Sequence, residues 1–174
     1  NINFEFIIEN EFRGKFIKNF PLSQYTSFKC GGKVKYLIYP EKICEVKKII
    51  EISKEFKKKF IFLGKGTNVL VSDNGFDGIV ISTLKMKNFT IEKNKIICEC
   101  GLKISDVLNI CIKNNLTGLE FLTGIPGTIG GGIKNNAGLK SQWISEKIDS
   151  IEYLEPENLN IVKTNPEYLE FMNK

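Results

Sequence analysis

The feature that most constrains this chain is one stretch rich in glycine. From Gly124 to Gly138 it reads GIPGTIGGGIKNNAG, with six glycines, one proline and one charged side chain in fifteen residues. Glycine loses more backbone entropy on folding than other residues, so it is retained most readily where the backbone turns sharply or approaches a ligand closely. The stretch therefore predicts a ligand-binding loop or, alternatively, a glycine-rich connection between packed elements.

A second glycine-rich loop, GKGTN, runs from Gly64 to Asn68 between two apolar runs, 60–63 and 69–71. Successive backbone N–H groups in such a loop form a concave nest that suits phosphate, and Lys65 adds a positive charge. The spacing fits neither the GxxxxGK[ST] loop nor the GxGxxG fingerprint. An ordinary hairpin turn is the alternative, but two such loops in one small chain indicate a long, phosphate-bearing cofactor.

The composition excludes several classes of function. Of 174 residues, 42% are hydrophobic and 26% are charged, which suits a core in one domain or two small lobes. The net charge of +5 comes from scattered lysines, and Arg13 is the only arginine, so we expect no nucleic-acid partner. No signal peptide and no apolar run near 18 residues is visible, so we expect no membrane contact.

Five scattered cysteines, without a C-x-x-C pair, predict free thiols in a reducing cytoplasm. Cys98 and Cys100 lie two apart in a strand pattern and so share a face. The sequence contains no histidine to complete a site with them, and we expect no metal. The lack of histidine also removes Ser-His and Cys-His nucleophilic pairs.

The first part of the chain, to about residue 84, predicts one lobe. Residues 1–18 predict an irregular entry with a short helix or strand, and residues 20–32 are turn-rich. Apolar patterns then predict four strands and one amphipathic helix, with turns at Asn74-Gly75 and Asp77-Gly78. The strands are at 34–39, 60–63, 69–72 and 79–83, and the helix is at 42–56. A βαβ-like unit places the GKGTN loop at the carboxyl end of a strand.

The second part, about residues 85–174, predicts another lobe. A hairpin is expected from Ile91 through residues 96–100, followed by a helix at 104–111 that Asn114-Asn115 and Gly118 close. The long glycine-rich stretch is expected to be a loop. Residues 148–154 and 160–163 predict a further pair of strands.

Three motifs carry a resemblance to a known family. In order, PLSQYTSFKCGG (21–32), FLGKGTNVLVSDNGFDGIVI (62–81) and GLEFLTGIPGTIGGGIKNNAG (118–138) resemble UDP-N-acetylenolpyruvoylglucosamine reductases, bacterial cell-wall flavoenzymes of the vanillyl-alcohol-oxidase type. The resemblance covers nearly the whole chain. It implies an α+β, two-lobed PCMH-type FAD-binding domain, with mixed sheets, flanking helices and FAD held in extended form between the lobes.

The resemblance also implies a cofactor site and a reaction. NADPH would reduce the flavin, whose N5 would then deliver hydride to UDP-N-acetylglucosamine enolpyruvate, giving UDP-N-acetylmuramate. The first glycine loop would cradle the FAD pyrophosphate, and the second would run beside the pyrophosphate and isoalloxazine. The implied cofactor-binding residues are Gly64, Lys65, Gly66, Thr67, Asn68, Val69, Gly124, Ile125, Pro126, Gly127, Thr128, Gly130, Gly131, Gly132, Lys134, Asn135, Asn136, Ala137 and Gly138.

The sequence departs from the family pattern at its C-terminal end. The family's catalytic serine and glutamate lie in a substrate domain beyond this sequence. A Tyr-Arg pair is expected shortly after a Glu-Phe, and here Glu170-Phe171 is followed by Met172-Asn173-Lys174, which puts Lys174 at the position of the substrate-orienting arginine. We therefore expect the chain to bind FAD without reducing the UDP-sugar, and a Gly127→Val substitution to abolish flavin retention.

Two other functions are alternatives. One is an FAD-dependent oxidase of the same fold, often with covalently attached flavin, although no histidine is present for a histidyl linkage. The other is a non-catalytic nucleotide-binding module, in which both glycine loops form turns or hold a simple nucleotide. Flavin content separates this module from the two flavoenzymes.

Overall fold

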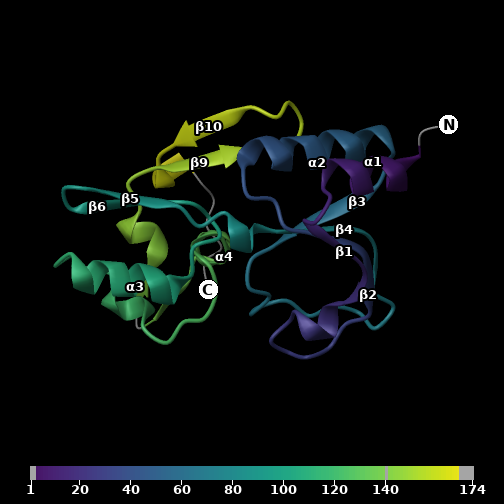
Figure 1. Ribbon diagram of the computed structural model, residues 1–174. Coiled ribbons are helices and arrows are strands. Elements are labelled where there is room, and N and C mark those ends of the chain that lie inside the picture. Colours follow the sequence, from purple (N-terminus) through teal and green to yellow (C-terminus); the bar gives the residue numbers. More distant parts are fainter. Residues whose placement is uncertain (1–2, 140, 169–174) are drawn as a thin grey trace. The chain divides into compact units, whose positions relative to one another are not determined.

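The computed structural model describes residues 3–139 and 141–168. The chain divides into two compact units, Asn1–Met86 and Lys87–Lys174. Figure 1 labels the α-helices and the longer strands. In the part of the chain that the structure describes, no helix combines the length and apolar character needed to cross a bilayer.

Unit 1 is built on a four-stranded mixed sheet with the order β1-β2-β4-β3. Its strands are β1 (Phe16–Pro21), β2 (Lys33–Ile38), β3 (Lys59–Leu63) and β4 (Phe76–Ser82). β1 pairs antiparallel with β2, whereas β2 and β3 both pair parallel with β4. The strands predicted at 34–39, 60–63 and 79–83 are confirmed, and so is the βαβ-like unit, with β4 inserted between its two strands.

The two faces of this sheet are covered differently. Helices α1 (Phe4–Glu11) and α2 (Ile43–Glu55) lie side by side along one face, where Ile8 and Ile49 pack on Tyr36 (Figure 1). Loops that follow β1 and β3 cover the other face. A register shift between Val34 and Tyr36 lets both of these residues, one on each face, lie buried. The predicted helix at 42–56 is confirmed as α2.

Two expectations for unit 1 are wrong, each for a local reason. Residues 69–72 form no strand, because Val69 and Val71 pack on the loop-covered face while Leu70 is exposed, which imitates strand alternation. The turn expected at Asp77-Gly78 lies inside β4, where the close approach of β3 leaves no room for a side chain on Gly78. The short helix or strand expected within residues 1–18 is found, since helix α1 lies there and strand β1 begins at Phe16.

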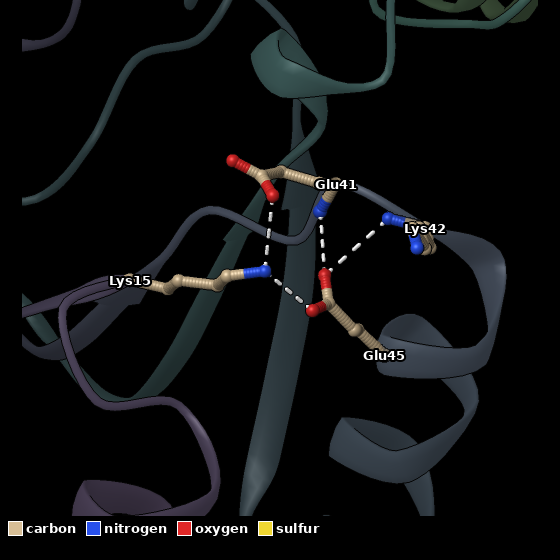
Figure 2. Close-up of polar contacts among 4 residues, drawn as sticks. All are labelled: Lys15, Glu41, Lys42 and Glu45. Carbon is tan, nitrogen blue, oxygen red and sulfur yellow. Dashed lines mark hydrogen bonds and ion pairs between the residues drawn. The ribbon is translucent and has the colours of Figure 1, made fainter.

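A carboxylate fixes the start of α2 (Figure 2). Glu45 accepts hydrogen bonds from the backbone N–H groups of Glu41, at 2.7 Å, and Lys42, at 3.3 Å. Its other oxygen contacts the Lys15 ammonium at 2.5 Å, and Lys15 also reaches Glu41 at 3.1 Å. Burial alone raises the pKa of Glu45, but the hydrogen bonds from Lys15 and the two backbone amides outweigh it and lower this pKa. The pair therefore ties the segment before β1 to the first turn of α2.

Replacing Glu45 with glutamine should lower the free energy of unfolding by about 1 kcal/mol at pH 7. A carboxyl whose pKa is depressed by folding stabilises the protein above its unfolded pKa, roughly 4.3, and loses that contribution as the pH falls through its folded pKa. The difference from the wild type should thus shrink from pH 7 to pH 3 in urea unfolding. Glu51→Gln, an exposed change of the same charge on α2, is the control; an equal, pH-independent loss in both variants would contradict the role of Glu45.

The described part of unit 2 combines short hairpins with two helices. Strands β5 (Phe89–Glu92) and β6 (Lys95–Cys98) pair antiparallel, as do β9 (Ile151–Leu154) and β10 (Ile161–Thr164). These pairs confirm the predicted hairpin and the predicted strand pair. Helix α3 (Ile104–Lys113) ends at Asn114, and Asn115 takes a positive φ, which confirms the predicted helix and its end. The remaining elements are α4 (Ile129–Lys134), β7 (Gly138–Leu139) and β8 (Gln142–Trp143).

Short 3-10 helices connect the elements of both units. They are η1 (Leu22–Gln24), η2 (Thr83–Lys85), η3 (Glu120–Leu122), η4 (Ile144–Lys147) and η5 (Pro166–Tyr168). The core of unit 2 forms where α3 packs on β6 and on the segments around η3 and η4, with Val107, Ile104 and Leu122 buried. Residues Ile129 and Ile133 of α4 pack on this core.

Candidate functional site

The GKGTN loop lies where the sequence analysis placed it, directly after β3. Because β3 and β4 run parallel, the loop begins a crossover connection and is not the hairpin turn considered as an alternative. Loops at the carboxyl ends of parallel strands commonly bind ligands. Lys65 and Asn68 are exposed, whereas Gly66 is buried with φ +69 against the ring of Tyr25.

Several backbone donors of this loop remain available. Among the described residues, the N–H groups of Lys65, Gly66 and Asn68 have no hydrogen-bond partner. Buried backbone donors are almost always paired, and of these three residues only Gly66 is buried, so its open donor beside the exposed Lys65 favours an anionic ligand. Thr67 and Val69 complete the predicted segment, and Val69 packs on the core below it. Phosphate binding by this loop stays a prediction, which its open donors and the charge of Lys65 favour.

Tyr25 makes a hydrogen bond to the first residue of this loop. Its hydroxyl donates a hydrogen bond to the carbonyl of Gly64 and lies 2.8 Å from the hydroxyl of Ser82, the last residue of β4. Burial raises the pKa of Tyr25 to about 12, with Ser82 acting weakly against it, so the phenol stays protonated and able to donate at neutral pH. Sequence reasoning missed Tyr25 and Ser82 as site residues, although Tyr25 lies inside the motif PLSQYTSFKCGG.

The long glycine-rich segment is partly helical, which corrects the expectation of a continuous loop. Residues 129–134 form α4, whose N-cap Thr128 is buried and accepts a hydrogen bond from the N–H of Gly131. The N–H groups of Ile129 and Gly130 bond to the carbonyls of Leu102 and Cys100, both at 2.8 Å. The first turn of α4 is thus tied to the segment before α3.

Packing inside unit 2 explains three of the six glycines. A Cβ on Gly130 would lie 2.7 Å from Cys100 Cβ, and one on Gly138 would lie 2.1 Å from the carbonyl oxygen of Gln142. A Cβ on Gly132 would lie 3.3 Å from the side chain of Ile104. These glycines need no ligand to account for them, and their contacts with a cofactor stay predictions.

Gly131 is different from its neighbours. A Cβ there would meet only Thr128 Oγ1, at 3.5 Å, and the residue has ordinary helical backbone angles. Gly124 and Gly127 instead adopt φ values of 83° and 131°, which L side chains rarely take. A valine at position 127 would therefore strain the backbone as well as block a ligand, so Gly131 is the cleaner position for a test.

The other residues predicted in this segment fall into three groups: hydrogen-bonded, packed on the core, and exposed. Asn136 is buried with φ 45°, and its side-chain oxygen accepts from the N–H of Ser145 at 3.3 Å, while Asn135 donates to the carbonyl of Gly131 at 2.9 Å. Ala137 and Ile125 pack on the core of unit 2. Pro126 and Lys134 are exposed. Lys174 lies outside the described residues.

The residues fit an anionic, phosphate-bearing cofactor better than a metal. The N–H groups of Gly127 and Thr128 have no hydrogen-bond partner among the described residues, in addition to the open donors after β3. Among these residues no group of three histidine, cysteine, aspartate or glutamate side chains could hold a metal ion. Among the described residues no cysteine forms a disulfide, and burial, with a smaller contribution from Cys100, raises the pKa of Cys98 to about 11.

Comparison with known proteins points to one class of cofactor. A family model described as FAD binding domain matches residues 34–157. The chain is 43% identical over 157 residues to the UDP-N-acetylenolpyruvoylglucosamine reductase of Caldicellulosiruptor saccharolyticus, a match that covers 90% of this chain and 50% of that relative. The chain spans about half the length of the curated relatives it matches.

Solved structures agree with this likeness. The UDP-N-acetylenolpyruvylglucosamine reductase of Thermus caldophilus is similar with a TM-score of 0.74 and 25% identity, over 91% of this chain and 54% of that one. The BBE-like 1 protein of Physcomitrella patens is similar in fold alone, with a TM-score of 0.66 and 12% identity over 94% of this chain and 38% of that one. The α+β, PCMH-type fold expected from the sequence is confirmed.

Proposed function

Because this chain belongs to the family of FAD-binding domains, we propose that it is the FAD-binding part of a UDP-N-acetylenolpyruvoylglucosamine reductase. The observation that carries the proposal is the pair of glycine segments with open backbone donors, one after β3 and one before α4. The order of the three motifs and the reductase names of the relatives support it.

In this proposal each segment binds a different part of the cofactor. The N–H groups of Lys65, Gly66 and Asn68 donate to the pyrophosphate of FAD, and the Lys65 ammonium adds a full charge. The N–H groups of Gly127 and Thr128, with the side-chain-free surface of Gly131, let the cofactor approach the backbone closely. FAD supplies the hydride chemistry when it is bound, and the protein positions it and neutralises its charge.

The proposed reaction is the one for which the relatives are named, reduction of the UDP-sugar enolpyruvate. NADPH is the proposed hydride donor, UDP-N-acetylglucosamine enolpyruvate is the proposed acceptor, and the product enters peptidoglycan synthesis in the cytoplasm. Residues outside the 174 of this sequence complete the substrate site in this proposal, since the chain matches about half of each relative.

A chimaera tests the proposal. The C-terminal half of the Caldicellulosiruptor saccharolyticus reductase is fused to the C-terminus of this chain, and NADPH consumption is measured with and without the UDP-sugar. We expect UDP-sugar-dependent oxidation of NADPH by the chimaera and none by this chain alone, because the two parts together complete the site. The intact relative serves as the positive control.

Two results would contradict the proposal. One is a flavin-loaded, folded chimaera that oxidises NADPH only through oxygen, as an oxidase-like protein would. The other is turnover of the UDP-sugar by the chain alone, which would mean that its own residues suffice for the reaction.

A further inference from the structure

The buried hydroxyl of Tyr25 connects two elements that flank the GKGTN loop. It donates to the carbonyl of Gly64, the first residue of the loop, and it lies 2.8 Å from Ser82 Oγ at the end of β4. Since the Tyr25 hydrogen is used on Gly64, the Ser82 hydroxyl donates to Tyr25 and in turn accepts from the N–H of Leu84 at 3.5 Å. Every hydrogen-bonding group in this chain of contacts is thereby paired.

The contact with Gly64 fixes the direction of the next backbone donor. A trans peptide is planar, and its C=O and N–H groups point to opposite sides. With the Gly64 carbonyl directed at Tyr25, the N–H of Lys65 points away from Tyr25. The described residues offer that N–H no partner. The phenol thus determines which way an open donor of the loop faces.

A second contact repeats the arrangement two residues later. The N–H of Ser27 donates to the carbonyl of Gly66 at 3.0 Å, so the following N–H, of Thr67, points away from the same segment. Gly66 itself packs on Tyr25, since a Cβ there would lie 2.9 Å from the ring. Residues 25–27 therefore hold the carbonyls of Gly64 and Gly66 on their own side of the loop.

We propose that Tyr25 is a positioning residue for the phosphate-binding loop, and that it sets the affinity for phosphate-bearing flavins without touching the cofactor. This inference rests on the proposed function, because the phosphate is that of FAD. Without the hydroxyl, the Gly64–Lys65 peptide is free to rotate, and each binding event must then order it. The loss falls on ligands that use the loop and spares the part of the flavin that lacks phosphate.

The test compares FAD with riboflavin, which has the same ring and no phosphate. Tyr25→Phe keeps the ring and removes the hydroxyl, and we expect FAD to bind on the order of tenfold more weakly, the effect of one hydrogen bond. The ratio of the riboflavin and FAD dissociation constants should fall by the same factor. Tyr39→Phe is the matched control, because Tyr39 packs in the same core cluster and its hydroxyl makes no hydrogen bond among the described residues.

The outcomes distinguish a failure of this inference from a failure of the proposed function on which it rests. An unchanged ratio in folded Tyr25→Phe would overturn the positioning role. Should Tyr25→Phe fail to fold, Ser82→Ala, which removes one of the two partners, must lower the ratio by a smaller factor, and an unchanged ratio there would also overturn it. Failure of the wild type itself to prefer FAD over riboflavin would instead contradict the proposed function.

Discussion

Replacing Gly131 with alanine is expected to stabilise the protein and to weaken FAD binding at the same time. Alanine is favoured over glycine inside a helix by up to about 1 kcal/mol, and a Cβ here meets only Thr128 Oγ1 at 3.5 Å. The same methyl group would hold the cofactor off the backbone. Inserting a methyl into a close contact costs about 1–3 kcal/mol, so we expect affinity to fall on the order of a hundredfold.

Urea unfolding and FAD titration of the same Gly131→Ala preparation measure the two effects. Ser105→Ala provides the control, because this exposed residue in the first turn of α3 also gains helix propensity and lies outside the predicted site. Its FAD affinity should match that of the wild type. A Gly131→Ala protein that is more stable and binds FAD as tightly as the wild type would remove α4 from the cofactor site.

Replacing Gly32 with alanine is expected to destabilise the protein, because this glycine serves the fold of unit 1. A Cβ on Gly32 would lie 2.1 Å from the carbonyl oxygen of Asp73 and 2.6 Å from the N atom of Gly75. Both contacts are with backbone, which cannot move aside as a side chain can. We expect the free energy of unfolding to fall by about 3 kcal/mol, the upper end for overpacking.

Gly14→Ala is the matched comparison for Gly32→Ala. Gly14 lies in the same unit and has φ +78, but a Cβ there would meet nothing within 4 Å, so its cost should be the roughly 1–2 kcal/mol of a left-handed backbone alone. In urea unfolding Gly32→Ala should therefore be the less stable of the two. Equal stabilities would show that the segment 71–75 yields to the added methyl, and the structural account of Gly32 would be wrong.

Regular elements with a strong pattern were predictable from the sequence. Val46, Ile49 and Ile50 are spaced for one helical face, and all three are buried in α2. β1 was predicted only as one of two alternatives within residues 1–18, because Asn19, with a φ of 50°, interrupts the alternation along Phe16–Pro21. The segment 69–72 alternates like a strand, yet Val69 and Val71 pack on the sheet face, which only the tertiary structure decides.

The candidate site was predictable in place but not in detail. Glycine content marked both segments as candidates, although packing within unit 2 by itself explains Gly130, Gly132 and Gly138. The contact of Tyr25 with Gly64 joins residues 39 positions apart, and no local pattern encodes it. Likewise, only the packed structure distinguishes Gly130, which Cys100 excludes from bearing a side chain, from Gly131, which has open space.

The measurement that tests the central claim most directly is the visible absorption spectrum of the purified protein, after incubation with FAD and desalting, together with its intact mass. We expect a flavin spectrum that persists through desalting, at the mass of this 174-residue chain, close to one FAD per protein. A folded protein that passes through desalting without flavin would contradict FAD binding by these two glycine segments.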